Sequence, residues 1–143
     1  MNRTGTINKV MNKKESLQGL IAQEHKKYSM MSQFSLLFTS PETFQGNMKN
    51  NLNTLRDLAR GFLGVIDSQL IAFDKNTHPK INSELKQEAE ILVRIIDKIG
   101  NIERGKLYED KDEITLIHND VELFDAKTKN VKNIANEMIL IMR

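Results

Sequence analysis

The chain has 143 residues, of which 39% are apolar and 28% are charged, and its formal net charge is +2. This size and composition are typical of one soluble globular domain spanning residues 1–143. The absence of cysteine excludes disulfides, thiolate metal sites and cysteine nucleophiles.

Two prolines, Pro41 and Pro79, separate long segments in which apolar residues recur every three or four positions. The first segment predicts a helix over residues 6–38, with a stripe formed by Leu17, Ile21, Glu24, Tyr28, Met31, Ser35 and Phe38. Ser40 is a suitable N-cap before Pro41, so we expect a second helix over residues 41–74.

The second half of the chain predicts two further helices. Pro79 suits the first position of a helix over residues 79–104, because its missing N–H has no partner there in any case. Asp110 and Glu113 have the spacing of a capping box and an acidic first turn, which predicts a last helix over residues 111–142.

The four apolar stripes have a period near 3.5 residues, which is typical of left-handed, nearly parallel helix packing. Short connections place consecutive helices antiparallel. We therefore predict an all-α fold, an elongated up-down-up-down four-helix bundle with coiled-coil-like packing. Its shared core is predicted to contain Leu55, Phe62, Ile66, Leu92, Ile95, Ile99, Val121, Phe124 and Val131.

The sequence contains no motif that marks a catalytic, cofactor or metal site. The three histidines lie on different segments, and the Glu-x-x-His pairs that hold two iron ions in helical bundles do not occur. Gly61 and Gly64 fall within a helical pattern, where their small size predicts the close approach of a neighbouring helix. We expect no catalytic residues, no cofactor and no metal, and a metal-free hydrolase or transferase ranks third among the functions considered.

Glu24 and Glu88 interrupt otherwise apolar stripes. A buried carboxylate is costly, so each needs a partner, a shifted pKa or access to solvent. Counting residues from the predicted helix ends places both in one layer, with Arg56 as the candidate cation and Thr128 as the candidate hydroxyl. We favour a polar layer that maintains helix register, and a catalytic or ligand-binding carboxylate pair is the alternative.

Residues 91–96 and 138–142 are more apolar than one buried helix face requires. Surplus apolar surface is either covered within the chain or offered to another chain. The candidate interface residues are Ile91, Val93, Ile139, Leu140 and Met142. We therefore predict a non-enzymatic protein–protein interaction module of adaptor, chaperone or inhibitor type, whose partner is another protein or a second copy in a homodimer.

The alternative function is a nucleic-acid-binding accessory protein that uses the basic first helix. Its candidate contacts are Lys13, Lys14, Lys26 and Lys27. Residues 1–40 carry a net charge of +4 and residues 109–125 carry −6, so complementary docking explains the pattern at least as well as phosphate contacts. Nucleic-acid binding usually concentrates more positive charge than this.

The expected location is the cytoplasm. The longest apolar run, from Met138 to Met142, is far too short to span a membrane, and the first residues lack the apolar segment of a secretory signal. Export by a dedicated secretion machine is equally compatible with the sequence.

Overall fold

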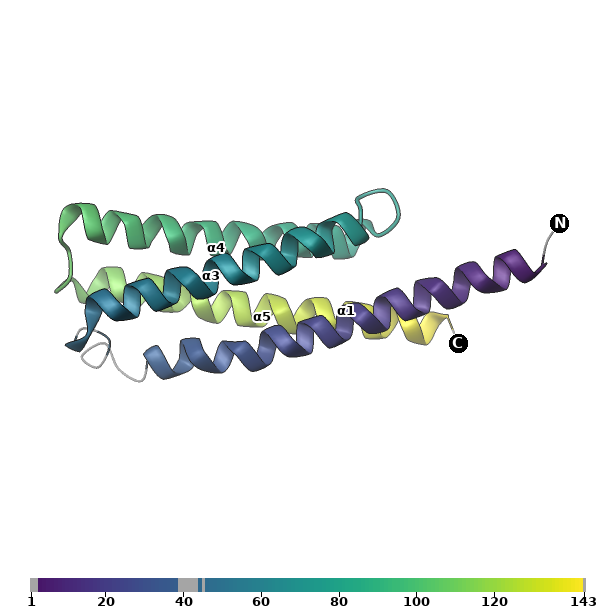
Figure 1. Ribbon diagram of the computed structural model, residues 1–143, viewed down its shortest axis with the longest axis horizontal. Coiled ribbons are helices and arrows are strands. Elements are labelled where there is room, and N and C mark those ends of the chain that lie inside the picture. Colours follow the sequence, from purple (N-terminus) through teal and green to yellow (C-terminus); the bar gives the residue numbers. More distant parts are fainter. Residues whose placement is uncertain (1–2, 39–43, 45, 143) are drawn as a thin grey trace.

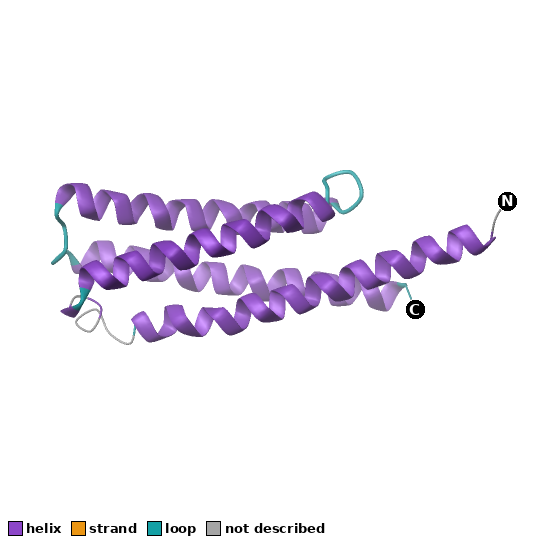
Figure 2. Ribbon diagram, viewed as in Figure 1, coloured by secondary structure: helices purple, strands orange, loops and turns teal. Residues whose placement is uncertain are grey.

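The computed structural model describes the backbone of residues 3–38, 44 and 46–142, and the side chains of residues 13–34, 36–38, 44 and 46–142. These residues form four helices and no strand: α1 (Arg3–Leu37), α3 (Met48–Ala72), α4 (Pro79–Gly105) and α5 (Lys111–Ile141). Each helix runs antiparallel to the next along an elongated body, and the α3–α4 and α4–α5 connections lie at its opposite ends (Figure 1, Figure 2). The predicted all-α four-helix bundle is confirmed.

The helices of the second half begin where their capping residues predict. Pro79 occupies the first turn of α4. Asp110 is the N-cap of α5, and its side chain accepts hydrogen bonds from the backbone N–H groups of Asp112 and Glu113 at 3.0 and 3.3 Å. These bonds satisfy N–H groups that have no partner within the helix.

The second helix differs from its prediction. The expected start at Ser40 and Pro41 lies outside the described residues, and α3 begins only at Met48. The first turns of α3 extend past the end of α1 (Figure 1). α3 is therefore displaced along the bundle axis relative to the predicted alignment.

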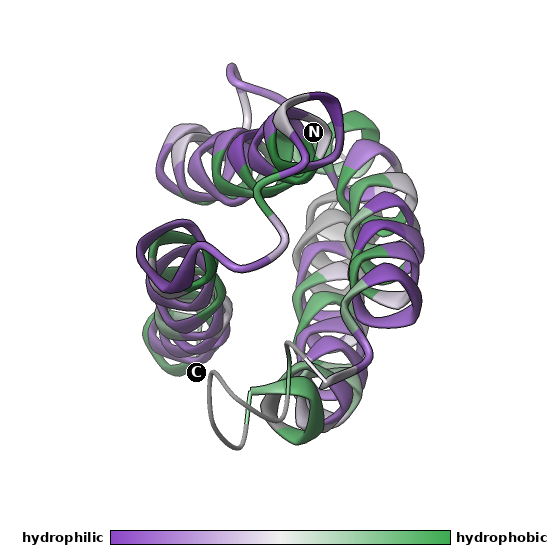
Figure 3. Ribbon diagram, turned by 90° about the vertical axis from the view of Figure 1, so that its left-hand side faces the viewer, coloured by the Kyte–Doolittle hydropathy of each residue, from purple (hydrophilic) through white to green (hydrophobic). Residues whose placement is uncertain are grey.

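The predicted core is confirmed. Its nine residues are 6% exposed or less, and they belong to one cluster of buried apolar side chains to which all four helices contribute. Phe34, Phe62 and Phe124 form an aromatic layer, with Phe62 ring centroids 5.4 Å from Phe34 and 5.0 Å from Phe124. Seen along the body, hydrophobic and hydrophilic bands alternate on every helix, as the stripes predict (Figure 3).

Gly61 and Gly64 do not have the predicted packing role. Both are exposed, and a Cβ atom added at either position would meet nothing within 4 Å. No described residue of a neighbouring helix approaches α3 there, because the two glycines lie on its outer face.

A membrane-spanning helix is not found in the described part of the chain, since no stretch of its helices combines sufficient length with sufficient hydropathy.

Candidate functional site

A buried polar layer crosses the interior between α1, α3 and α4. Its members Glu24, Lys27, Gln69 and Glu88 are at most 1% exposed. The Lys27 ammonium lies at the centre: Nζ donates to Glu88 Oε2 at 2.8 Å and to Gln69 Oε1 at 3.1 Å, and it pairs with Glu24 Oε1. Gln69 Nε2 donates to Glu24 Oε1 at 2.9 Å. The structure thus brings Glu24 and Glu88 together through a lysine of α1.

This polar layer holds two carboxyl groups and one ammonium group. Burial raises the pKa of Glu24, and burial raises the pKa of Glu88 from 4.5 to about 7, with Lys27 opposing both shifts. Glu24 Oε2 and Glu88 Oε1 have no hydrogen-bond partner among the described residues. An unpaired buried carboxylate oxygen favours protonation. Near neutral pH the layer therefore titrates between a neutral form holding one extra proton and a form with one net negative charge.

Arg56 does not belong to the polar layer, contrary to the prediction. It lies thirteen residues before Gln69 on α3, about 20 Å along the helix, and it pairs with Glu103 at 2.5 Å. The prediction aligned the helices as if a tight turn followed the first one, whereas α3 begins at Met48. The aligned residue of α3 is therefore Gln69.

Thr128 lies close to the polar layer but is not bonded to it. Its side chain is buried and lines a cavity of about 270 Å³ together with Glu24. Its hydroxyl donates to the backbone carbonyl of Phe124 at 3.0 Å, one turn earlier in α5. The hydroxyl is therefore satisfied within its own helix.

Lys27 is not on the surface, where the nucleic-acid alternative requires it. It was predicted to contact nucleic acid from the surface, but it is 1% exposed. Among the described side chains of α1, the buried ones are Leu17, Leu20, Glu24, Lys27, Met31 and Phe34. This stripe is displaced from the predicted one, and Tyr28 is 46% exposed. This second stripe contains an acid and a base three residues apart, a spacing that lets them pair inside the bundle. Of the other three lysines, Lys13 and Lys26 are exposed and Lys14 is half-buried.

The predicted interface residues differ in their exposure. Ile91 and Ile139 are only 3% and 6% exposed, so the fold covers them and the prediction is wrong for this pair. Val93 and Leu140 are 45% and 63% exposed and stay predicted contact residues. Met142 is half-buried.

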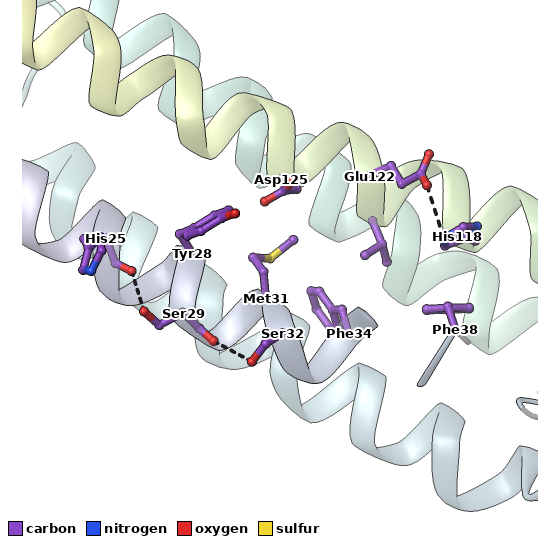
Figure 4. Close-up of a pocket in the computed structure, with 11 residues that line it drawn as sticks. His25, Tyr28, Ser29, Met31, Ser32, Phe34, Phe38, His118, Glu122 and Asp125 are labelled. Atoms are coloured by element: carbon purple, nitrogen blue, oxygen red, sulfur yellow. Dashed lines mark hydrogen bonds and ion pairs between the residues drawn. The ribbon is translucent and has the colours of Figure 1, made fainter. Parts of the chain in front are cut away.

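A groove of about 530 Å³ follows the seam between α1 and α5 (Figure 4). Its apolar lining consists of Met31, Phe34, Phe38 and Val121. On the α1 side stand Ser29 and Ser32, whose hydroxyls donate to backbone carbonyls of α1 itself at 3.1 and 2.8 Å. The hydrogen bonds of these short side chains are made within α1, so the side chains do not cross the seam.

The α5 side of the groove is acidic. Asp125 Oδ2 pairs with Lys129 at 3.1 Å, while Asp125 Oδ1 is buried and has no partner among the described residues. Glu122, which is 68% exposed, pairs with His118 at 3.4 Å, and the His118 ring stacks on Phe38 with centroids 5.1 Å apart. An apolar interior beside a charged rim is characteristic of surfaces that receive a protein segment.

The neighbouring seam between α4 and α5 is closed by polar bridges. Lys98 donates to Asp120 at 2.6 Å, and Lys127 donates to Gln87 at 2.6 Å. Both bridges cross from one helix to the other. Across the α1–α5 groove, Ser29 and Ser32 form no such bridge, because their hydroxyls bond within α1.

Among the described residues, no three His, Asp or Glu side chains come together as a metal ion requires. No protein-family model matches the chain, and no curated protein or solved structure matches it either. Function must therefore be inferred from the residues of the chain and their geometry.

Proposed function

We propose that this chain is a non-enzymatic protein–protein interaction module, of adaptor, chaperone or inhibitor type, which receives a helix of a partner in the α1–α5 groove. The observation that carries the proposal is the apolar lining of a groove whose α5 rim is charged. From His25 to Phe38, the residue after the end of α1, the groove is about 20 Å long. An amphipathic helix of about four turns matches that length and would place its apolar face inward.

The nucleic-acid alternative loses support because one of its four lysines, Lys27, is buried. The groove itself carries Glu122 and Asp125 on its α5 side, and carboxylates there would repel phosphate groups. The geometry therefore favours a protein segment.

Site-specific photocrosslinking tests the proposal. A photoreactive phenylalanine analogue replaces Ser32 in the groove, and in a control protein it replaces Ser68 on the outer face of α3. The two serines are a matched pair, since both are exposed and each hydroxyl bonds to a carbonyl of its own helix. In cells that normally make the protein, we expect a discrete protein adduct from position 32 and none from position 68.

A second variant separates binding from folding. Ser29→Trp places a large side chain in the groove, so the adduct from position 32 should disappear while the unfolding free energy stays close to that of wild type. Absence of any adduct at position 32, or equal adducts at both positions, would contradict the proposal.

A further inference from the structure

The first turns of α1 extend past the ends of the other three helices (Figure 1). We call residues 3–14 the basic arm, because they include Arg3, Lys9, Lys13 and Lys14 and no acidic residue. The arm also contains three apolar residues, Ile7, Val10 and Met11. A helix of this length is marginally stable alone in water, so packing against a second surface would stabilise it.

The α1–α5 groove has the complementary chemistry. Its interior is apolar, and its α5 rim carries Glu122 and the unpartnered Asp125 Oδ1. The arm is about 17 Å long as a helix, and the groove from His25 to Phe38 is about 20 Å long. The basic arm and the groove therefore match in length, in hydropathy and in charge.

The arm and the groove lie at opposite ends of the same helix. When two α1 helices are placed side by side and antiparallel, each arm lies beside the groove of the other copy, so both contacts form together around a two-fold axis. Such a pairing closes as a dimer and leaves no contact surface for further copies. The axis falls near Gly19 and Ala22, which are both exposed, and their small size allows the two helix backbones to approach.

We infer that two copies of this chain form an antiparallel dimer in which the basic arm of each copy occupies the α1–α5 groove of the other. The inference depends on the proposed function, because it requires that the groove accept a helix, and it names the partner as a second copy.

A charge-swap experiment on the full-length chain tests the dimer. One variant reverses the arm (Lys9→Glu with Lys13→Glu), and a second variant reverses the groove (Glu122→Lys with Asp125→Asn). Sedimentation equilibrium should show a wild-type dimer, and each variant alone should associate about tenfold more weakly or worse, because charges of like sign then meet. An equimolar mixture should regain wild-type affinity, since each reversed surface then meets an opposite charge.

The control is Glu90→Lys with Asp97→Asn, two exposed acids on α4 that change the net charge as much as the groove variant does. It should dimerise like wild type. A monomeric wild-type chain, or a dimer that neither reversal weakens, would overturn the inference. An adduct from position 32 with a different protein, in a chain that stays monomeric, would overturn the dimer and leave the proposed function standing.

Discussion

The aromatic layer and the polar layer lie next to each other in one interior. Phe34 follows Lys27 by seven residues and Phe62 precedes Gln69 by seven, so the layers are about 10 Å apart along the axis. Side chains of both layers are at most 1% exposed. Equal burial is therefore reached with opposite chemistry.

This difference shows that burial alone does not determine how a layer contributes to stability. The aromatic layer contributes through apolar area and ring packing, which do not change with pH. The polar layer contributes according to how many protons it holds, because Glu88 and Glu24 compete for the single ammonium of Lys27. Buried ion pairs of this kind often add little stability and instead favour one helix register over others.

The largest expected effect comes from the aromatic layer. Phe62 contacts both other rings and is fully buried, so Phe62→Ala should lower the unfolding free energy by about 3 to 5 kcal/mol. Urea denaturation at about pH 5 and about pH 8 should give the same loss, since no titrating group is removed. A loss that varied with pH would mean that the two layers are energetically coupled.

Removing the cation of the polar layer should lower the unfolding free energy by an amount that depends on pH. Lys27→Met leaves two buried carboxyl groups without an ammonium, which should cost about 3 kcal/mol at about pH 8. The loss should be smaller at about pH 5, because Glu88 then holds its proton and burial also raises the pKa of Glu24. Lys26→Met removes the exposed neighbouring lysine and should change the unfolding free energy by less than about 0.5 kcal/mol.

The raised pKa of Glu88 predicts how wild-type stability depends on pH. The folded chain holds the proton up to about pH 7, whereas the unfolded chain loses it near 4.5. The contribution is therefore fully present below pH 4.5 and is lost as pH rises through 7, a decrease on the order of 3 kcal/mol.

Glu88→Gln isolates this contribution. Unfolding free energies measured from about pH 4 to about pH 8 should fall less steeply for this variant than for wild type, because the titrating group is gone. Glu90→Gln, an exposed carboxyl on the same helix, should leave the wild-type slope unchanged. Identical slopes for all three proteins would show that Glu88 does not hold its proton in the fold.

The smallest effect is expected outside both layers. Gly61→Ala and Gly64→Ala should each raise the unfolding free energy by about 0.5 to 1 kcal/mol, because alanine favours the helix and the added Cβ meets nothing. Gly100→Ala provides the comparison within α4, where the new Cβ would lie 3.1 Å from Arg104 Nη1. Its gain in thermal or urea denaturation should be smaller, since the arginine must move.

Much of the fold could be predicted because its determinants are local. Pro79 and Asp110 act on the turn that follows them, and the predicted starts of α4 and α5 agree with the structure. The interior stripes of α3, α4 and α5 were identified from spacing alone, because each helix has one dominant apolar face. The presence of Glu24 and Glu88 in one layer was also anticipated, since both interrupt such stripes.

Tertiary structure decided which side chains lie between the carboxyl groups of Glu24 and Glu88. In α1 two overlapping stripes compete, and packing selected the one through Lys27 in place of the one through Tyr28. The position of α3 along the axis, which brings Gln69 and not Arg56 to the polar layer, depends on a connection whose path has no local signature. The α1–α5 groove exists only once short serine side chains face an opposing helix.

The sequence by itself therefore determined which residues form helices and which faces are apolar, because these are properties of a few turns. Tertiary structure decided which face of α1 is buried, how α3 is aligned along the axis, and where the groove forms. These depend on how helices far apart in sequence share one interior.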